Sequence, residues 1–74
     1  MSPKQCVVAR GLIGLTQTEL AEAANLGLST VIDYELARRR VSDHVVGEIR
    51  AALEAAGVEF TNGKRPGVRL RPKG

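Results

Sequence analysis

Basic side chains are concentrated in the second half of this 74-residue sequence. Residues 1–37 carry two basic and four acidic side chains, a net charge of −2, whereas residues 38–74 carry nine basic and four acidic ones, a net charge of +5. This distribution favours a polyanionic partner, most simply a nucleic acid, although a solvated surface has the same composition. The basic clusters are Arg38, Arg39 and Arg40, and near the C-terminus Lys64, Arg65, Arg69, Arg71 and Lys73.

Side chains that could perform catalysis or bind a metal are scarce. The sequence has one cysteine, Cys6, and one histidine, His44, which excludes an intrachain disulfide and a zinc site built on cysteines. We therefore expect no enzymatic activity, no cofactor and no metal. Cys6 is expected to pack as a small apolar residue, and His44 to lie on the surface. Cysteine usage, together with the lack of a signal peptide and of a long apolar run, predicts a cytoplasmic, nucleoid-associated protein without a membrane partner.

Start and stop signals predict four helices before residue 58. The residues expected to cap three of their N-termini are Ser2, Thr16 and Ser42. Thr16 and Glu19 have the spacing of a capping box, and the third helix is expected over residues 28–36. The residues expected to end the other three helices are Gly14, Asn25 and Gly57.

Beyond Gly57 the pattern changes to an alternation of apolar and polar residues. This alternation predicts two short strands, at 58–60 and 68–71, with a turn at Asn62-Gly63. The strands are expected either to form a hairpin or to pair with another chain. We expect them to supply a dimer contact through Val58, Phe60, Val68 and Leu70.

Three residues in and around the turn between the second and third expected helices have the spacing of a helix-turn-helix. Ala21 is small enough for two helices to cross closely, and Asn25, four residues later, tolerates the positive φ that the turn requires. Val31, six residues further on, fills the space between the two helices. The alternative is an ordinary helical hairpin within a small bundle.

The segment 15–39, LTQTELAEAANLGLSTVIDYELARR, resembles the XRE family of bacterial and phage regulators, with lambda-repressor-like and Cro-like domains. The resemblance covers about residues 4–56. It implies a mainly α fold, a compact four-helix helix-turn-helix domain over residues 1–56, followed by a short β-hairpin or strand pair and a basic tail over 57–74. It also implies a transcription regulator, acting as a repressor, that binds double-stranded DNA sequence-specifically as a homodimer on a palindromic operator.

The resemblance also implies roles for individual residues. The residues expected to contact DNA phosphates are Thr16, Gln17, Arg38, Arg39 and Arg40. Arg10 and Glu35 match a pair that joins the first helix to the third in related domains. The sequence departs from the family pattern at Gly27, where a serine or threonine usually opens the third helix, and at Ala37, where glycine often ends it.

Helical periodicity indicates which side chains of the third helix face outward. With Val31 inward, 3.6 residues per turn direct Ser29, Ile32, Asp33 and Leu36 away from the core. This face carries no Arg, Asn or Gln for a bidentate base contact, so part of the specificity is expected to come from DNA shape. The residues expected to contact bases are Leu28, Ser29, Thr30, Ile32 and Asp33.

Other functions use the same fold. The exposed apolar residues Leu28, Ile32 and Leu36 would also suit a protein-binding regulator that docks a transcription factor or polymerase. An antitoxin or restriction-controller role would need the same DNA-binding chemistry. No small-molecule effector is expected, because 74 residues leave no room for a separate sensor domain.

Overall fold

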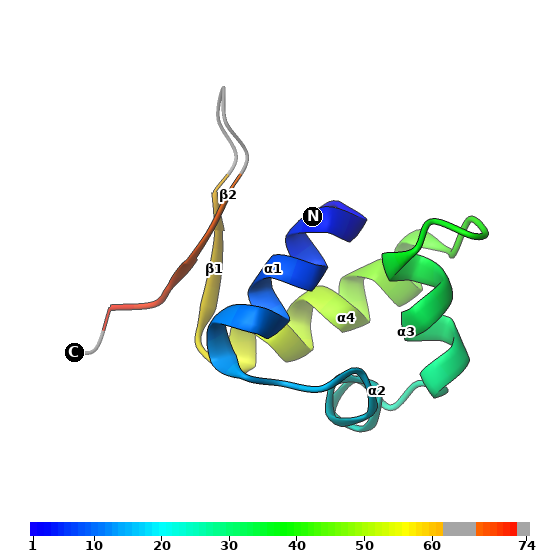
Figure 1. The fold of residues 1–74 in the computed structure, drawn as a ribbon, viewed down its shortest axis with the longest axis horizontal. Helices are drawn as coiled ribbons and strands as arrows, with labels where there is room; N and C mark the ends of the chain where they lie inside the picture. Colours follow the sequence, from blue (N-terminus) through cyan, green and yellow to red (C-terminus); the bar gives the residue numbers. More distant parts are fainter. Residues whose placement is uncertain (62–66, 73–74) are drawn as a thin grey trace.

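The computed structural model describes residues 1–61 and 67–72 and contains, in that part of the chain, four helices followed by two strands. The β-strands lie at one end of the molecule and α2 and α3 at the other, with α1 and α4 between them (Figure 1). The predicted fold class, mainly α with a short C-terminal hairpin, is confirmed. The elements are α1 (Pro3–Ile13), α2 (Gln17–Ala24), α3 (Leu28–Glu35), α4 (Asp43–Ala55), β1 (Val58–Thr61) and β2 (Gly67–Leu70).

The predicted caps account for where most of the helices begin. In the capping box of α2, the Glu19 backbone N–H donates to Thr16 Oγ1 at 3.0 Å, and the Thr16 N–H donates to Glu19 Oε1 at 2.9 Å. Ser2 caps α1 in the same way, and Ser42 caps α4 through a single bond. Gly27, which precedes α3, supplies no side-chain cap. Local hydrogen bonding therefore fixes three of the four starting points.

One core is shared by all the helices and the first strand. Ala21 is only 3% exposed where α2 meets the rest of the core, and Val31 is fully buried, as the helix-turn-helix spacing predicts. A small side chain at position 21 lets the helices approach, and the β-branched side chain at position 31 fills the gap between them. The buried core residues are Cys6, Ala9, Leu20, Ala21, Val31, Tyr34, Ile49, Leu53 and Val58.

The two strands pair with each other in an antiparallel hairpin within the chain. Val58 lies opposite Leu70 and Phe60 opposite Val68. Val58 is fully buried in the helical core and has no surface to offer a second chain, whereas Leu70 is 54% exposed. The hairpin is also tied to α1, because Gln5 Nε2 donates to the Gly67 carbonyl oxygen at 3.1 Å. The predicted turn and several residues of the predicted basic tail lie outside the described residues, namely Asn62, Gly63, Lys64, Arg65 and Lys73.

Candidate nucleic-acid interface

The turn between α2 and α3 is short and held by its own backbone. Asn25 adopts the left-handed conformation, with φ 58° and ψ 45°, and the Leu26 N–H donates to the Ala21 carbonyl oxygen at 2.8 Å. This closes α2 and directs the chain straight into α3. Together with the packing of Ala21 and Val31, the turn gives α2 and α3 the geometry of a helix-turn-helix.

The side of α3 opposite the core is open to solvent. Val31 and Tyr34 are the buried residues of α3, while Leu28 is 41% exposed and Leu36, at its C-terminal end, 57% exposed. All five predicted base-contacting residues belong to this helix. Leu28 and Ser29 are exposed, and Thr30, Ile32 and Asp33 are half-buried. The helix therefore presents a continuous surface of mixed apolar and hydroxyl character.

A buried ionic network anchors α3 to α1. Arg10 Nε and Nη2 donate to the Glu35 carboxylate at 2.6 and 2.7 Å, a bidentate geometry that forms the expected pair. The Glu35 side chain is 2% exposed and also accepts from Cys6 Sγ at 3.2 Å. Arg10 further donates to the carbonyl oxygen of Leu15 at 3.1 Å, just before α2. The network therefore joins α1, α3 and the segment that leads into α2.

Gln17 belongs to this network as well. Its Nε2 donates to Glu35 Oε1 at 2.9 Å, and the side chain is half-buried. One of its two amide hydrogens is thus engaged with Glu35, and the second can still donate to a ligand. Sequence reasoning placed Gln17 at the surface and did not foresee this bond, which depends on where α3 lies relative to α2.

The network shifts the pKa values of its members. Burial alone would raise the pKa of Glu35, but the hydrogen bonds from Arg10, Gln17 and Cys6 outweigh it and hold the pKa below the usual 4.5. Burial, followed by the hydrogen bond to Glu35, strongly raises the pKa of the Cys6 thiol. The carboxylate is therefore ionised and the thiol protonated at neutral pH, so Cys6 acts as a donor to Glu35 and not as a nucleophile.

An arginine lies against the open side of α3. Arg39 Nε donates to Asp33 Oδ2 at 2.9 Å, and Arg39 Nη2 makes a longer contact of 3.4 Å with Thr30 Oγ1. The helix itself carries no Arg, Asn or Gln, as predicted, but Arg39 from the following segment lies beside it. The chain reverses at Ala37, in the left-handed conformation at φ 54°, and returns Arg39 alongside the helix.

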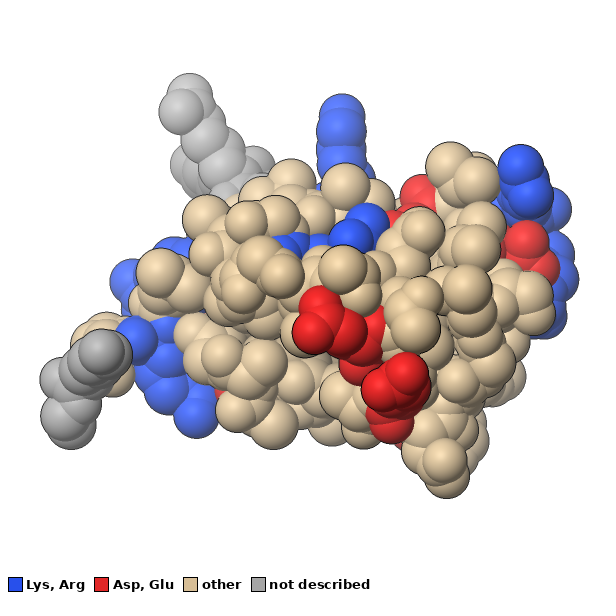
Figure 2. Space-filling model, turned by 60° about the horizontal axis from the view of Figure 1, so that its bottom comes forward, with Lys and Arg blue, Asp and Glu red and all other residues tan. Residues whose placement is uncertain are grey.

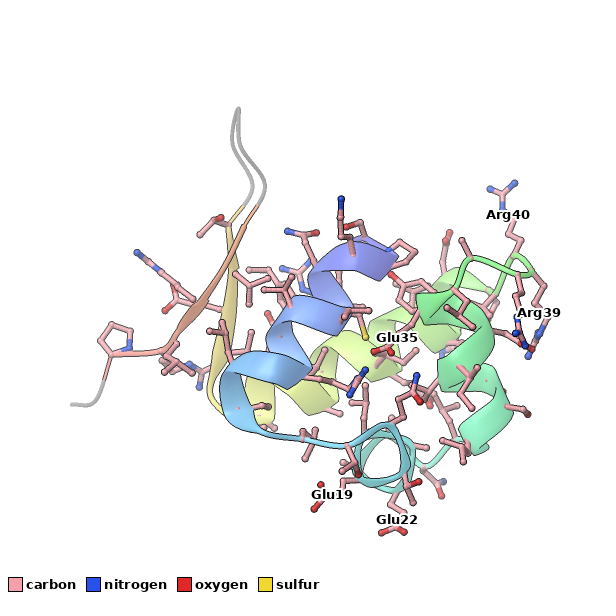
Figure 3. The ribbon with its side chains drawn as sticks, viewed as in Figure 1. Glu19, Glu22, Glu35, Arg39 and Arg40 are labelled. Carbon is pink, nitrogen blue, oxygen red and sulfur yellow. The ribbon has the colours of Figure 1, made fainter. Side chains whose placement is uncertain are left out.

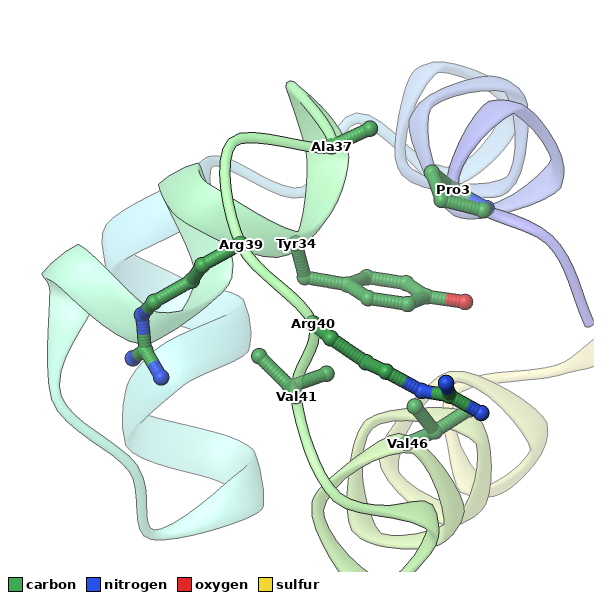
Figure 4. A pocket seen from close by; sticks show the side chains of 7 residues that line it. All are labelled: Pro3, Tyr34, Ala37, Arg39, Arg40, Val41 and Val46. Carbon is green, nitrogen blue, oxygen red and sulfur yellow. The ribbon is translucent and has the colours of Figure 1, made fainter.

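The neighbouring arginine points elsewhere. Figure 3 shows Arg39 running along the outer side of α3, whereas Arg40 extends away from the loop in another direction. Arg40 lines an open hollow of about 330 Å³ between the N-terminus of α1, the end of α3 and α4 (Figure 4). Arg39 and Arg40 are therefore not equivalent, because only Arg39 bonds to α3. The residues that line this hollow are Pro3, Tyr34, Ala37, Arg39, Arg40, Val41 and Val46.

Comparison with known protein families agrees with this geometry. Residues 9–60 match the family model described as Helix-turn-helix, the model of the XRE-type regulators. The chain belongs to this helix-turn-helix family. No curated protein matches the sequence at a significant level. Because the family binds DNA and regulates transcription, the chain is a DNA-binding helix-turn-helix regulator. The match extends past residue 56 and includes most of β1, in keeping with the burial of Val58 in the shared core.

Charge is unevenly distributed over this helix-turn-helix domain. Figure 2 shows acidic side chains together in the foreground and basic side chains at both ends of the molecule, with a few between them. Glu19 and Glu22 are exposed on α2, and the hydrogen bonds from Thr16 lower the pKa of Glu19. Negative charge is therefore concentrated around Glu19 and Glu22, and positive charge where the arginines follow α3.

Other functional features are limited within residues 1–61 and 67–72. No group of three or more His, Cys, Asp or Glu side chains in that part of the chain could hold a metal ion. None of the described helices is both long and apolar enough to cross a membrane. His44 is exposed in the first turn of α4 and lies 2.8 Å from Glu48. The hydrogen-bond and ion-pair contacts described above therefore lie mainly on α3 and on the residues beside it.

Proposed function

We propose that this chain is a sequence-specific repressor that binds double-stranded DNA as a homodimer, with α3 in the major groove. The observation that carries the proposal is the open side of α3, which Glu35 and Arg10 hold in a fixed position while the opposite side packs into the core. A rigid helix with one free face is the form that major-groove recognition requires. Repression needs only occupancy of the operator.

The base contacts are assigned to the first turns of α3. Ser29 and Thr30 carry hydroxyl groups that can bond to bases or phosphates, and Leu28 and Ile32 can contact thymine methyl groups. Exposure of Leu28 and Ser29 makes them available without rearrangement. Asp33 is the one acidic residue on this side, and its pairing with Arg39 compensates the repulsion it would otherwise experience near phosphates.

Phosphate contacts are assigned to the flanks of the helix-turn-helix. Thr16 is exposed at the N-terminal end of α2, and Gln17 there retains one free amide hydrogen after its bond to Glu35. Arg38 and Arg40 are exposed after α3. These groups flank α3 on both sides, as backbone contacts that set the register of a recognition helix must.

Dimerisation is proposed because one small domain reads too few base pairs to select a genomic site. Two copies related by a two-fold axis double the contact and match a palindrome with half-sites about one helical turn apart. The hairpin is the proposed contact. Since Val58 is buried in its own subunit, the contact falls to the outer residues, above all Leu70, with Phe60 and Val68 at its margin.

The test is selection of bound sites from a random DNA pool, followed by measurement of affinity for the selected and for a scrambled duplex at several salt concentrations. We expect a palindromic consensus, a preference for it of at least about 10³-fold and a protein dimer in sedimentation. Equal affinity for both duplexes would refute sequence-specific recognition. A monomer that binds a single half-site with full affinity would refute the dimer.

A second candidate function is supported by the exposed apolar side chains on the same helix. Leu28 and Leu36 are large, exposed and close to the open side of α3, a composition that also suits a protein partner such as a transcription factor or polymerase. This candidate predicts no enrichment in the DNA selection and loss of partner binding when Leu28 and Leu36 are replaced by serine. Sequence-specific selection that depends on Ser29 would exclude it.

A further inference from the structure

The guanidinium of Arg39 lies beside the proposed DNA-reading side of α3, although its residue is not part of that helix. Its Nε is 2.9 Å from Asp33 Oδ2 and its Nη2 is 3.4 Å from Thr30 Oγ1. Asp33 and Thr30 are both on α3, three residues apart, and therefore on one side of it. Two side chains of the helix thus contact and orient the guanidinium, and Figure 3 shows Arg39 beside α3.

The contacts with α3 use only one edge of the guanidinium. Arginine has five N–H donors, one on Nε and two on each terminal nitrogen. The bonds to Asp33 and Thr30 engage the edge formed by Nε and Nη2. The adjacent edge, with one hydrogen of Nη2 and those of Nη1, has no partner among the described residues, and the side chain is 53% exposed.

The free edge has the donor pattern that matches one base. Two parallel N–H donors at the end of an arginine complement the O6 and N7 acceptors of guanine in the major groove. Adenine offers one acceptor and one donor at the same positions, and pyrimidines offer no such pair, so the match is selective. A guanidinium held in advance by a carboxylate also loses less conformational freedom on binding than a free side chain.

We propose that Arg39 reads a guanine in the major groove and that Asp33 is the positioning residue that orients it. The proposal rests on the proposed function, because it requires α3 to enter the groove, and it replaces the phosphate contact expected of Arg39 from sequence. It also gives Asp33 a role that does not bring a bare carboxylate close to DNA. The side chains of Arg38 and Arg40 form no ion pair with Asp33 among the described residues, and these two arginines keep the role of phosphate contacts.

The experiment compares site selection and duplex affinity for the full chain and three variants. Arg39→Ala removes the donors, Arg39→Lys keeps the charge but loses the planar fork, and Asp33→Asn keeps the shape but weakens the hold on Nε. The matched control is Lys4→Ala, which also removes one positive charge, from an exposed residue of α1. Circular dichroism of each variant checks that the helices are intact.

We expect the wild-type consensus to contain one guanine per half-site that both Arg39 variants no longer select. Replacing that guanine should lower wild-type affinity about 10-fold or more and leave the affinity of Arg39→Ala nearly unchanged. Asp33→Asn should reduce the preference at the same base pair only, which loss of a structural contact elsewhere would not do. Lys4→Ala should keep the consensus.

Two results would overturn the proposal in distinguishable ways. If Arg39→Ala weakens binding to every duplex by the same factor and leaves the consensus unchanged, or if no selected guanine depends on Arg39, the side chain contacts phosphate and the guanine assignment is wrong. If the wild-type protein selects no consensus at all, the proposed DNA-binding function itself fails, and the role of Arg39 fails with it.

Discussion

The Arg10–Glu35 pair should be the most costly polar interaction to break in this protein. Glu35 is 2% exposed and Arg10 17% exposed, so removal of one partner leaves the other charge largely shielded from water. We choose Arg10→Met, which retains the aliphatic bulk of the side chain, and Glu35→Gln, which retains the shape of the carboxylate. The double variant completes a cycle in which the pair is removed without leaving a charge behind.

The size of the effect follows from burial. Exposed ion pairs contribute about 0–1 kcal/mol, whereas loss of one partner from a buried pair costs about 3–5 kcal/mol. Arg10 retains some access to water, so we expect Arg10→Met to cost about 3 kcal/mol and Glu35→Gln about 1–2 kcal/mol. A domain of 74 residues has a total stability of roughly 4–11 kcal/mol, so the first variant would lose a large part of it.

The assay is urea denaturation of the four proteins, followed by circular dichroism at neutral pH. We expect a coupling energy of about 2 kcal/mol between Arg10 and Glu35. The pair Arg50–Glu54 serves as a matched control, since it is an i,i+4 pair on α4 with side chains 36% and 39% exposed. Its cycle should give no more than about 0.5 kcal/mol. Equal coupling energies in the two cycles would refute the argument from burial.

The same pair predicts how stability depends on pH. The pKa of Glu35 is lower in the folded protein than its ordinary value of 4.5, so the unfolded chain binds this proton more readily. The stabilisation by the carboxylate is therefore complete above that ordinary value and is lost as the pH falls through the lower folded pKa. The stability difference between wild type and Glu35→Gln should shrink as the pH falls below about 4.5. A difference that stays constant in acid would contradict the ionised network.

Four further variants test other parts of the structure. Ala37→Gly should raise the free energy of unfolding, measured in urea, by about 0.5–1 kcal/mol. The reason is that relief of the left-handed strain at residue 37 exceeds the entropy that glycine adds to the unfolded chain. A loss of stability would contradict strain at this residue. Leu70→Asp should convert the dimer to a monomer in sedimentation, with helicity unchanged. Val58→Ala, by contrast, should lower the free energy of unfolding by about 2 kcal/mol, because Val58 is buried. A Leu70→Asp protein that stays dimeric would show that the outer face of the hairpin is not the interface. Gln17→Ala should lower affinity for all duplexes alike and leave base preference intact; an altered consensus would show that Gln17 does more than contact a phosphate.

Features that depend on a few neighbouring residues could be predicted from sequence. The capping box at Thr16 and the left-handed Asn25 are set by hydrogen bonds within four residues, and the structure contains both. The spacing from Ala21 to Val31 likewise reflects one short turn and a direct contact between two helices. The pairing of Arg10 with Glu35 was implied by the family resemblance and not by composition or periodicity, since the two residues are 25 positions apart.

Features that depend on long-range packing could not be predicted in the same way. Alternation indicated a strand at Val58 but did not indicate that this side chain enters the helical core, which depends on how the hairpin lies against α1 and α4. This burial also means that truncation after Gly57, a natural test of the hairpin as an interface, would remove a core residue. Substitution of Leu70 is therefore the cleaner test. The bond of Gln17 to Glu35 was likewise missed because it joins two different helices.

The position of Arg39 was missed for a more specific reason. Helical periodicity assigns outward-facing residues only while the helix lasts, and α3 ends at Glu35. The Arg38 N–H donates to the Asp33 carbonyl oxygen and the Ala37 N–H to that of Tyr34, which is the pattern of a Schellman closure with alanine in the usual place of glycine. This closure reverses the chain and brings residue 39 back to residue 33. The sequence signal was weak because alanine rarely adopts this conformation.

The two carboxylates of α3, Glu35 and Asp33, have different roles: Glu35 stabilises the fold, and Asp33 is proposed to take part in DNA recognition. Asp33 and Glu35 are two positions apart, so helical geometry turns their side chains about 200° from each other. Glu35 points into the scaffold, where Arg10 binds it, and Asp33 points outward, where Arg39 binds it. Glu35→Gln should therefore lower the free energy of unfolding and leave the selected DNA sequence unchanged. Asp33→Asn should change the selected sequence with an effect on unfolding of no more than about 0.5 kcal/mol, as expected for a partly exposed pair. If both variants altered stability and base preference to the same extent, the inward and outward sides of α3 would not be separable, and the division of roles argued from their burial would be wrong.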